Sequence, residues 1–385
     1  MSSALATAFA AHGLNEAALA QIMDKSPDAL FTTILSLSKL AGLSVEERAI
    51  CDGLLAKILP KIGPSERAAF AETVSAADRP NPALITALAK ADPDIAKPLV
   101  FHKGLTTNDL GDLIRKGPSD LQAAIATRKH LKAETIDTLL DEANPAALVG
   151  LVKNTTAQFT QANFSRAKDK AADHPPLQAA VLSRTDLSPV VAHDMFWDTH
   201  PVLRPLVFQK HSIDPGNIER VIADAVEDGL FDCDPADLLR MFNLATSGKG
   251  RVRVDKLVSV IEDRQLKDFM QLLAALTGAA PSIVSRMVQD TSGESLAVAC
   301  RALDGDRSEF TRMFLEVSFL NSGEAKPLSA IEKAGRVFDH VDPERARSAI
   351  GIWNISQQMV KQTPQGVATQ DPAPSAQPAD DVFEI

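Results

Sequence analysis

Tyrosine is absent from this chain, and aromatic residues as a whole are scarce. Only 5% of the 385 residues are aromatic. Because strand-rich folds draw on aromatic and β-branched residues, whereas this sequence is rich in Ala and Leu, its composition favours helix. The three cysteines (Cys51, Cys233 and Cys300) are far apart and form no C-x-x-C pair. A disulfide framework is therefore not predicted, and the reducing cytoplasm is the expected location.

Long apolar runs are missing as well. No stretch approaches the roughly 18–20 apolar residues that a membrane-spanning helix needs. The first Lys or Arg of the chain is Lys25, so the N-terminal MSSALATAFAAHG lacks the basic start of a signal peptide. Its apolar run is also interrupted at His12 and Gly13, and we therefore expect a first helix there rather than a cleaved signal peptide. The excess of 50 acidic over 40 basic residues gives a net charge of −10, which argues against a duplex-binding protein.

A 26-residue repeat is the most informative feature that is present. Apolar anchors recur between about Asp92 and Ala225, with steps of 26, 26, 30 and 26 residues. Apolar residues four positions before each anchor complete the i, i+4 stripe of a short amphipathic helix. The anchors are Leu99, Ile125, Leu151, Val181 and Val207. Each unit is too small to bury its own apolar face, so neighbouring units must stack.

The same columns contain helix-start residues. Pro93, Pro145, Pro175 and Pro201 stand six residues before an anchor, where the missing N–H of proline costs nothing. A second helix follows in each unit, and its expected N-caps are Thr106, Ser188 and Asp214, whereas Lys132 breaks the capping pattern. We therefore predict an all-α fold, an α-solenoid of HEAT-like helix pairs.

The remaining chain divides into three parts. Residues 1–91 are predicted to form further helical segments, which are either degenerate repeats or a capping bundle, in front of an array at 92–230. Residues 231–360 read as a separate helical region without the 26-residue period. Residues 361–385 are rich in Pro, Ala, Gln and Asp, so we expect a disordered acidic tail.

Several runs also resemble a bacterial family of HEAT-like repeat proteins, catalogued as domain of unknown function 2336. They are ADPDIAKPLVFHKGLTTNDLGDLIRKG, LQAAIATRKHLKAETIDTLL and LVKNTTAQFTQANF, with later stretches as a continuation, and together cover roughly residues 30 to 330. The resemblance implies a helical solenoid and supplies no catalytic residue to carry over.

Motifs that would indicate chemistry are incomplete. His193 and His200 lack the spacing of a zinc site, and the run from Asp232 to Asp237 lacks the Gly and Glu of a calcium loop. Ser247–Gly250 is a fragment of a phosphate loop, so an inter-helix linker or an anion contact fits it. We thus predict no catalytic residue, cofactor or metal, and a protein that is not an enzyme.

The second helices of the units should line one continuous face, on which acidic residues outnumber basic ones. Trp197 lies one step from the buried stripe, next to Asp194 and Asp198, and is either a binding anchor in a groove or buried against the next repeat. This face predicts a protein–protein interaction scaffold or regulatory adaptor that receives a basic or amphipathic segment. Nucleic-acid binding is the alternative, and an enzyme site assembled across helices is a third.

The last six residues, DDVFEI, combine acidic and apolar side chains. Val382, Phe383 and Ile385 stand among Asp380, Asp381 and Glu384. Such a segment suits docking on a partner or in the groove of its own molecule, and a solvated tail end is the other interpretation.

Overall fold

A computed structural model of the chain describes residues 27–38, 44–246, 254–324 and 326–359. Within these residues the fold is all-α, as predicted, with 22 α-helices and four short 3₁₀ helices, η1 to η4. A single antiparallel bridge between Phe231 and Met359 is the only β contact in this part of the chain. No helix of the described residues is both long and apolar enough to span a membrane.

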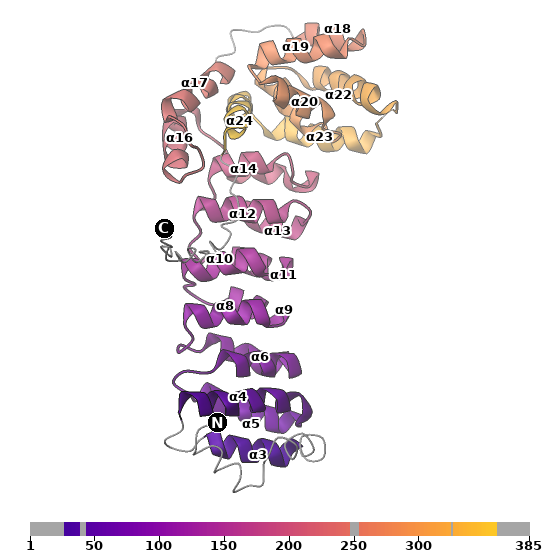
Figure 1. Cartoon of the computed structure of the whole chain (residues 1–385). Helices are drawn as coiled ribbons and strands as arrows, with labels where there is room; N and C mark the ends of the chain where they lie inside the picture. The colour runs from indigo at the N-terminus through magenta and orange to yellow at the C-terminus, as the bar shows by residue number, and fades with distance from the viewer. Residues whose placement is uncertain (1–26, 39–43, 247–253, 325, 360–385) are drawn as a thin grey trace, which may run out of the picture.

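Helices α3 to α14 are stacked in one elongated column, with the C-terminal helices at one end (Figure 1). The column begins with the helices before the repeat: α3 (Pro27–Ser38), α4 (Val45–Ile58), η1 (Leu59–Lys61), α5 (Pro64–Ser75) and α6 (Pro82–Ala91). Because α6 packs against both α7 and α8, this segment continues directly into the repeat.

Each repeat unit contributes one helix to each of two layers. The first helices are α7 (Pro93–Ala96) with η2 (Lys97–Phe101), α9 (Ser119–Ala126), α11 (Pro145–Lys153), α13 (Pro175–Leu182), and η3 (Pro201–Leu203) with α15 (Pro205–Lys210). The second helices are α8 (Thr107–Lys116), α10 (Ala133–Glu142), α12 (Gln161–Ala171), α14 (Pro189–Met195), and η4 (Pro215–Asn217) with α16 (Ile218–Glu227). Helices of one layer pack on their counterparts in the next unit, as α9, α11 and α13 do.

The caps explain where these helices begin. Thr106, Ser188 and Asp214 each accept a hydrogen bond from a backbone N–H of the following turn, as expected. The first and fifth units differ from prediction, because their first helices are not continuous. They break near Pro98 and Pro205, since proline has no N–H to donate within a helix.

Hydrogen bonds repeated along the array join each unit to the one before it. A side chain just after one first helix donates to carbonyl oxygens at the end of the preceding first helix, which lack intrahelical partners. The pairs are Arg128 to Val100 and His102, Asn154 to Ala126 and Arg128, Arg184 to Val152 and Asn154, and His211 to Leu182. We call this set the carbonyl ladder. It fixes the spacing between units and therefore the loops that follow.

The C-terminal region packs on the end of the array through its first and last helices. Its helices are α17 (Pro235–Thr246), α18 (Val254–Glu262), α19 (Leu266–Thr277), α20 (Pro281–Gln289), α21 (Glu294–Ala302), α22 (Arg307–Ser322), α23 (Leu328–His340) and α24 (Pro343–Ser356). Helix α17 contacts α16, and helix α24 contacts α14, α17 and α21. Helix α24 also buries Trp353 completely. One hydrophobic core thus extends from the array into this region.

Candidate anion-binding pocket

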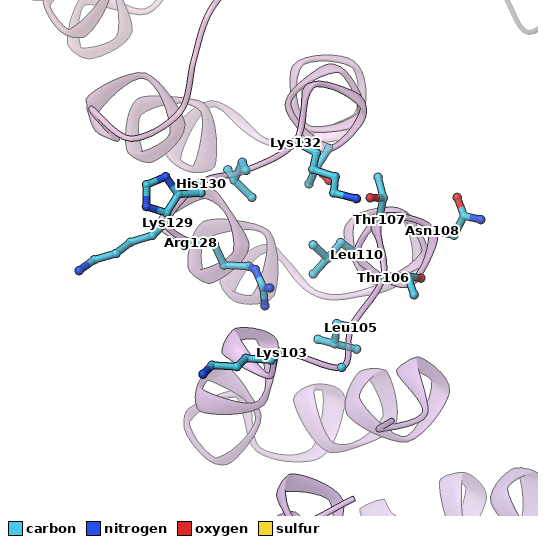
Figure 2. A pocket seen from close by; sticks show the side chains of 13 residues that line it. Lys103, Leu105, Thr106, Thr107, Asn108, Leu110, Arg128, Lys129, His130 and Lys132 are labelled. Atoms are coloured by element: carbon cyan, nitrogen blue, oxygen red, sulfur yellow. The ribbon is translucent and has the colours of Figure 1, made fainter. Parts of the chain in front are cut away.

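A pocket of about 580 Å³ lies between the loops that precede α8 and α10. Its walls come from two consecutive units, residues 103–108 and 110 of one and residues 128–132 and 135 of the next. Lys103, Arg128, Lys129, His130 and Lys132 line it, and none of the lining residues is acidic. In the view of Figure 2, Lys103 and Lys129 extend from adjacent loops in the same direction, and Lys132 lies on the other side near Thr107.

The 26-residue period places these lysines. Lys129 occupies the place in its unit that Lys103 occupies in the one before, so stacking brings the two to adjacent loops. The corresponding residues of the next two units are Ala157 and Thr185, and no lysine continues the column there. The concentration of positive charge is therefore local to this pair of units.

Lys132 stands at the N-cap of α10, where the other units have a capping side chain. Thr106, Thr160 and Ser188 cap their helices, whereas Lys132 provides no side-chain cap to α10. A lysine here forgoes about 1 kcal/mol of capping stabilisation, and its charge lies near the positive end of the helix dipole. An anion at this place would contact both the ammonium group and the uncapped first turn.

The three lysines of the pocket have no acidic partner among the residues that the structure describes. Lys103, Lys129 and Lys132 are exposed, and none of them forms an ion pair with another described residue. Arg128 differs, because its guanidinium group donates to carbonyl oxygens of the carbonyl ladder and burial lowers its pKa. The lysines are thus available to a ligand, while Arg128 holds the wall in place.

The backbone of the pocket is also fixed. A side chain at Gly104 would place its Cβ only 2.1 Å from the carbonyl oxygen of Asp78, so this loop approaches the preceding one more closely than any other residue allows. His130 has a φ of 54°, in the left-handed region that non-glycine residues rarely adopt. Its N–H donates to Thr156 Oγ1 at 3.2 Å. Such constrained backbone geometry, next to a helix whose N-cap residue Lys132 provides no capping side chain, is typical of functional positions.

Comparison with known proteins places the chain in a family. The model of a family described as an uncharacterised protein conserved in bacteria, domain of unknown function 2336, matches residues 95–351. The chain belongs to this family. The expected membership of this family is therefore confirmed, and the matched segment of the domain of unknown function 2336 includes every residue of the pocket. No curated protein and no solved structure matches the chain.

The residues predicted to bind a partner lie at the junction with the C-terminal region. Trp197 is half-buried, with its ring 4.7 Å from that of Trp353 on α24 and 4.6 Å from the guanidinium carbon of Arg286. Asp194 pairs with Lys168 at 2.6 Å. Asp198 is exposed and lies 3.7 Å from Arg286. Trp197 thus contacts α24 and Arg286 of α20, two helices that the period did not connect to this unit.

Val382, Phe383 and Ile385, the other predicted partner-binding residues, lie outside the described residues, as does the Ser247–Gly250 loop. Some of the acidic residues expected to line a groove are paired with basic neighbours. Arg166 of α12 pairs with Asp137 and Asp141 of α10. Lys116 likewise pairs with Asp112 within α8.

The basic pocket, the one lined by Lys103, Lys129 and Lys132, was not predicted from the sequence. The charges of residues 128–132 come next to those of the preceding unit only when the two units stack. One signal was nevertheless present, because Lys132 was the single departure from the series of caps.

A second polar site joins the array to the C-terminal region. Arg204, before α15, contacts both carboxylate oxygens of Asp290 at 3.0 Å and Glu294 Oε2 at 3.3 Å. All three side chains are nearly inaccessible to solvent. Burial raises the pKa of Glu294 to about 7, with Arg204 opposing and Asp290 reinforcing the shift. The positive charge of Arg204 and hydrogen bonds from serines lower the pKa of Asp290, although burial acts in the other direction.

Proposed function

We propose that the protein is a non-catalytic interaction scaffold, an α-solenoid of HEAT-like helix pairs, and that its basic pocket binds an acidic segment of a partner protein. The observation that carries this proposal is the set of unpaired lysines, Lys103, Lys129 and Lys132, in a pocket without an acidic residue. An acidic segment supplies the countercharge that these lysines lack within the described residues.

The charge pattern favours this partner over the others. A basic segment was expected from the acids of the second helices, but Asp137, Asp141 and Asp194 already have basic partners. A duplex would need phosphate contacts repeated along the array, and the lysine column ends after two units. The two-unit width of the pocket suits a short peptide.

Binding of a defined probe tests the proposal. The probe is a fluorescein-labelled peptide of alternating glutamate and phenylalanine, and its affinity is measured by fluorescence anisotropy at increasing salt. The double variant Lys129→Glu, Lys132→Glu should bind it at least about tenfold more weakly, since each of two attractive contacts becomes repulsive.

Lys153→Glu, Lys210→Glu is the matched control. Both lysines are exposed and lie at the ends of array helices, and the net charge changes by the same amount. Equal weakening by the two double variants would show a response to net charge alone and would contradict a specific pocket. Labelled duplex DNA, measured in parallel, would be the preferred ligand if the nucleic-acid alternative held.

A further inference from the structure

The chemistry of the basic pocket sets the features of its occupant. Lys103, Lys129 and Lys132 line the pocket together with Leu105 and Leu131. Both leucines are largely buried in the core, with 7% and 8% of their surface exposed. The lysines therefore select an occupant that presents several carboxylates over a short length, and only small apolar surfaces of the two leucines lie beside it.

One segment of the chain itself has this pattern. DDVFEI, at 380–385, places three carboxylates among Val382, Phe383 and Ile385 within six residues. The residues from 361 to 379 contain a single acidic residue, Asp371. The complementary charge is thus concentrated at one end of the tail.

The connecting chain is long enough to reach the pocket. Twenty residues separate Met359, which is bridged to Phe231, from Asp380. A random-coil chain of twenty residues has an average end-to-end distance of about 25 Å, and a fully extended one spans about 70 Å. Helix α24 packs on α14, and α14, α12 and α10 are successive neighbours at about 10 Å each. The span from α24 to the pocket is therefore comparable with the average reach.

We propose that DDVFEI occupies the basic pocket of its own molecule, so that a partner binds by displacing it. This inference rests on the proposed peptide-binding role of the pocket. Tethering gives the segment an effective concentration on the order of 1 mM, which makes a weak intrinsic affinity sufficient for occupancy. The tail then acts as an intramolecular competitor that sets the apparent affinity for the partner.

Zero-length carbodiimide cross-linking of the full-length protein tests the contact directly. The expected products join Lys129 or Lys132 to Asp380, Asp381 or Glu384 within a monomer, at a yield that does not change with protein concentration. Lys153 and Lys210 serve as internal controls. Equal linkage of the tail to all four lysines, absence of linkage, or linkage confined to dimers would each overturn the proposal.

A competition measurement supplies the functional test. In the full chain, Asp380→Asn, Asp381→Asn and Glu384→Gln together should tighten binding of the acidic probe at least about fivefold, because the competitor is removed. Asp371→Asn, which removes an acidic residue outside the segment, should leave the affinity unchanged. Unaltered affinity in the triple variant overturns self-occupancy.

The two proposals fail in different ways. If the probe binds and the lysine reversals weaken it, but the triple variant and cross-linking show no tail contact, the scaffold role stands without self-occupancy. If the probe binds neither the wild type nor the triple variant, the scaffold role fails, and the cross-linking pattern alone decides the tail contact.

Discussion

The contacts that join successive units differ in kind from those that join the array to the C-terminal region. Between units, the carbonyl ladder repeats one local solution, in which Asn154 and Arg184 satisfy carbonyl oxygens about 26 to 32 residues earlier. At the junction, Trp353 Nε1 donates to the carbonyl of His193, 160 residues away, and Arg204 pairs with two buried carboxylates. The ladder is modular, whereas the junction is a single arrangement.

This difference predicts two patterns of stability. Stacked units that contact only their neighbours are stabilised by nearest-neighbour terms, so a change in the ladder should act on the adjoining units. A change at the junction should instead separate the C-terminal region from the array. Substitutions in the two places, from the largest expected effect to the smallest, test whether the comparison holds.

Trp353→Ala should have the largest effect, a loss of about 4 kcal/mol in the free energy of unfolding. The side chain is fully buried and its ring lies 4.9 Å from that of Phe196. Urea unfolding followed by circular dichroism should show a second transition, as the C-terminal region unfolds separately. Phe164→Ala, an equally buried change in α12, should lower stability without this separation. A single transition in both variants would contradict the distinction.

Arg204→Met should cost about 3 kcal/mol at pH 8, because it leaves Asp290 and Glu294 buried without their cation. The loss should be measured by urea unfolding under the same conditions. Adding Asp290→Asn and Glu294→Gln to this variant should recover most of the stability, since the remaining groups are neutral. Failure of the triple variant to recover would assign the loss to packing against Phe196 rather than to charge.

Glu294→Gln should alter how stability depends on pH, by about 2 kcal/mol between pH 5 and pH 8. Burial raises the pKa of Glu294 from 4.5 to about 7. Between these values the unfolded chain has released the proton and the folded protein retains it, so wild-type stability falls as the pH rises through this window. The glutamine variant lacks this loss. Its stability relative to wild type should therefore increase toward pH 8, and a constant difference would contradict the assignment.

The period, the caps and the family were accessible from sequence because they are local. The spacing of Leu99 and Ile125 alone indicates the buried stripe of a helix. Thr106 and Ser188 each mark a helix start, because they accept a hydrogen bond from the backbone of the next turn. The junction was not accessible, because nothing near Trp197 indicates that Trp353 packs on it. The pocket lies between these cases. Lys132 stands out in the sequence as a missing N-cap. That Lys103 and Lys129 lie beside it becomes clear only when the two units are stacked.

Asn154→Ala should have the smallest effect, about 1 kcal/mol. The side chain donates to the carbonyls of Ala126 and Arg128 at 3.0 and 2.7 Å, and water reaches part of this site once the amide is gone. Hydrogen exchange should increase in α9 and α11 and stay unchanged in α21 and α24. The loss should also be the same in the Trp353→Ala background. Asn154 and Trp353 have no hydrogen-bond partner in common, so the effects of the two substitutions should add. A larger loss in that background would show that the junction stabilises the array as a whole, and the ladder would then not be modular.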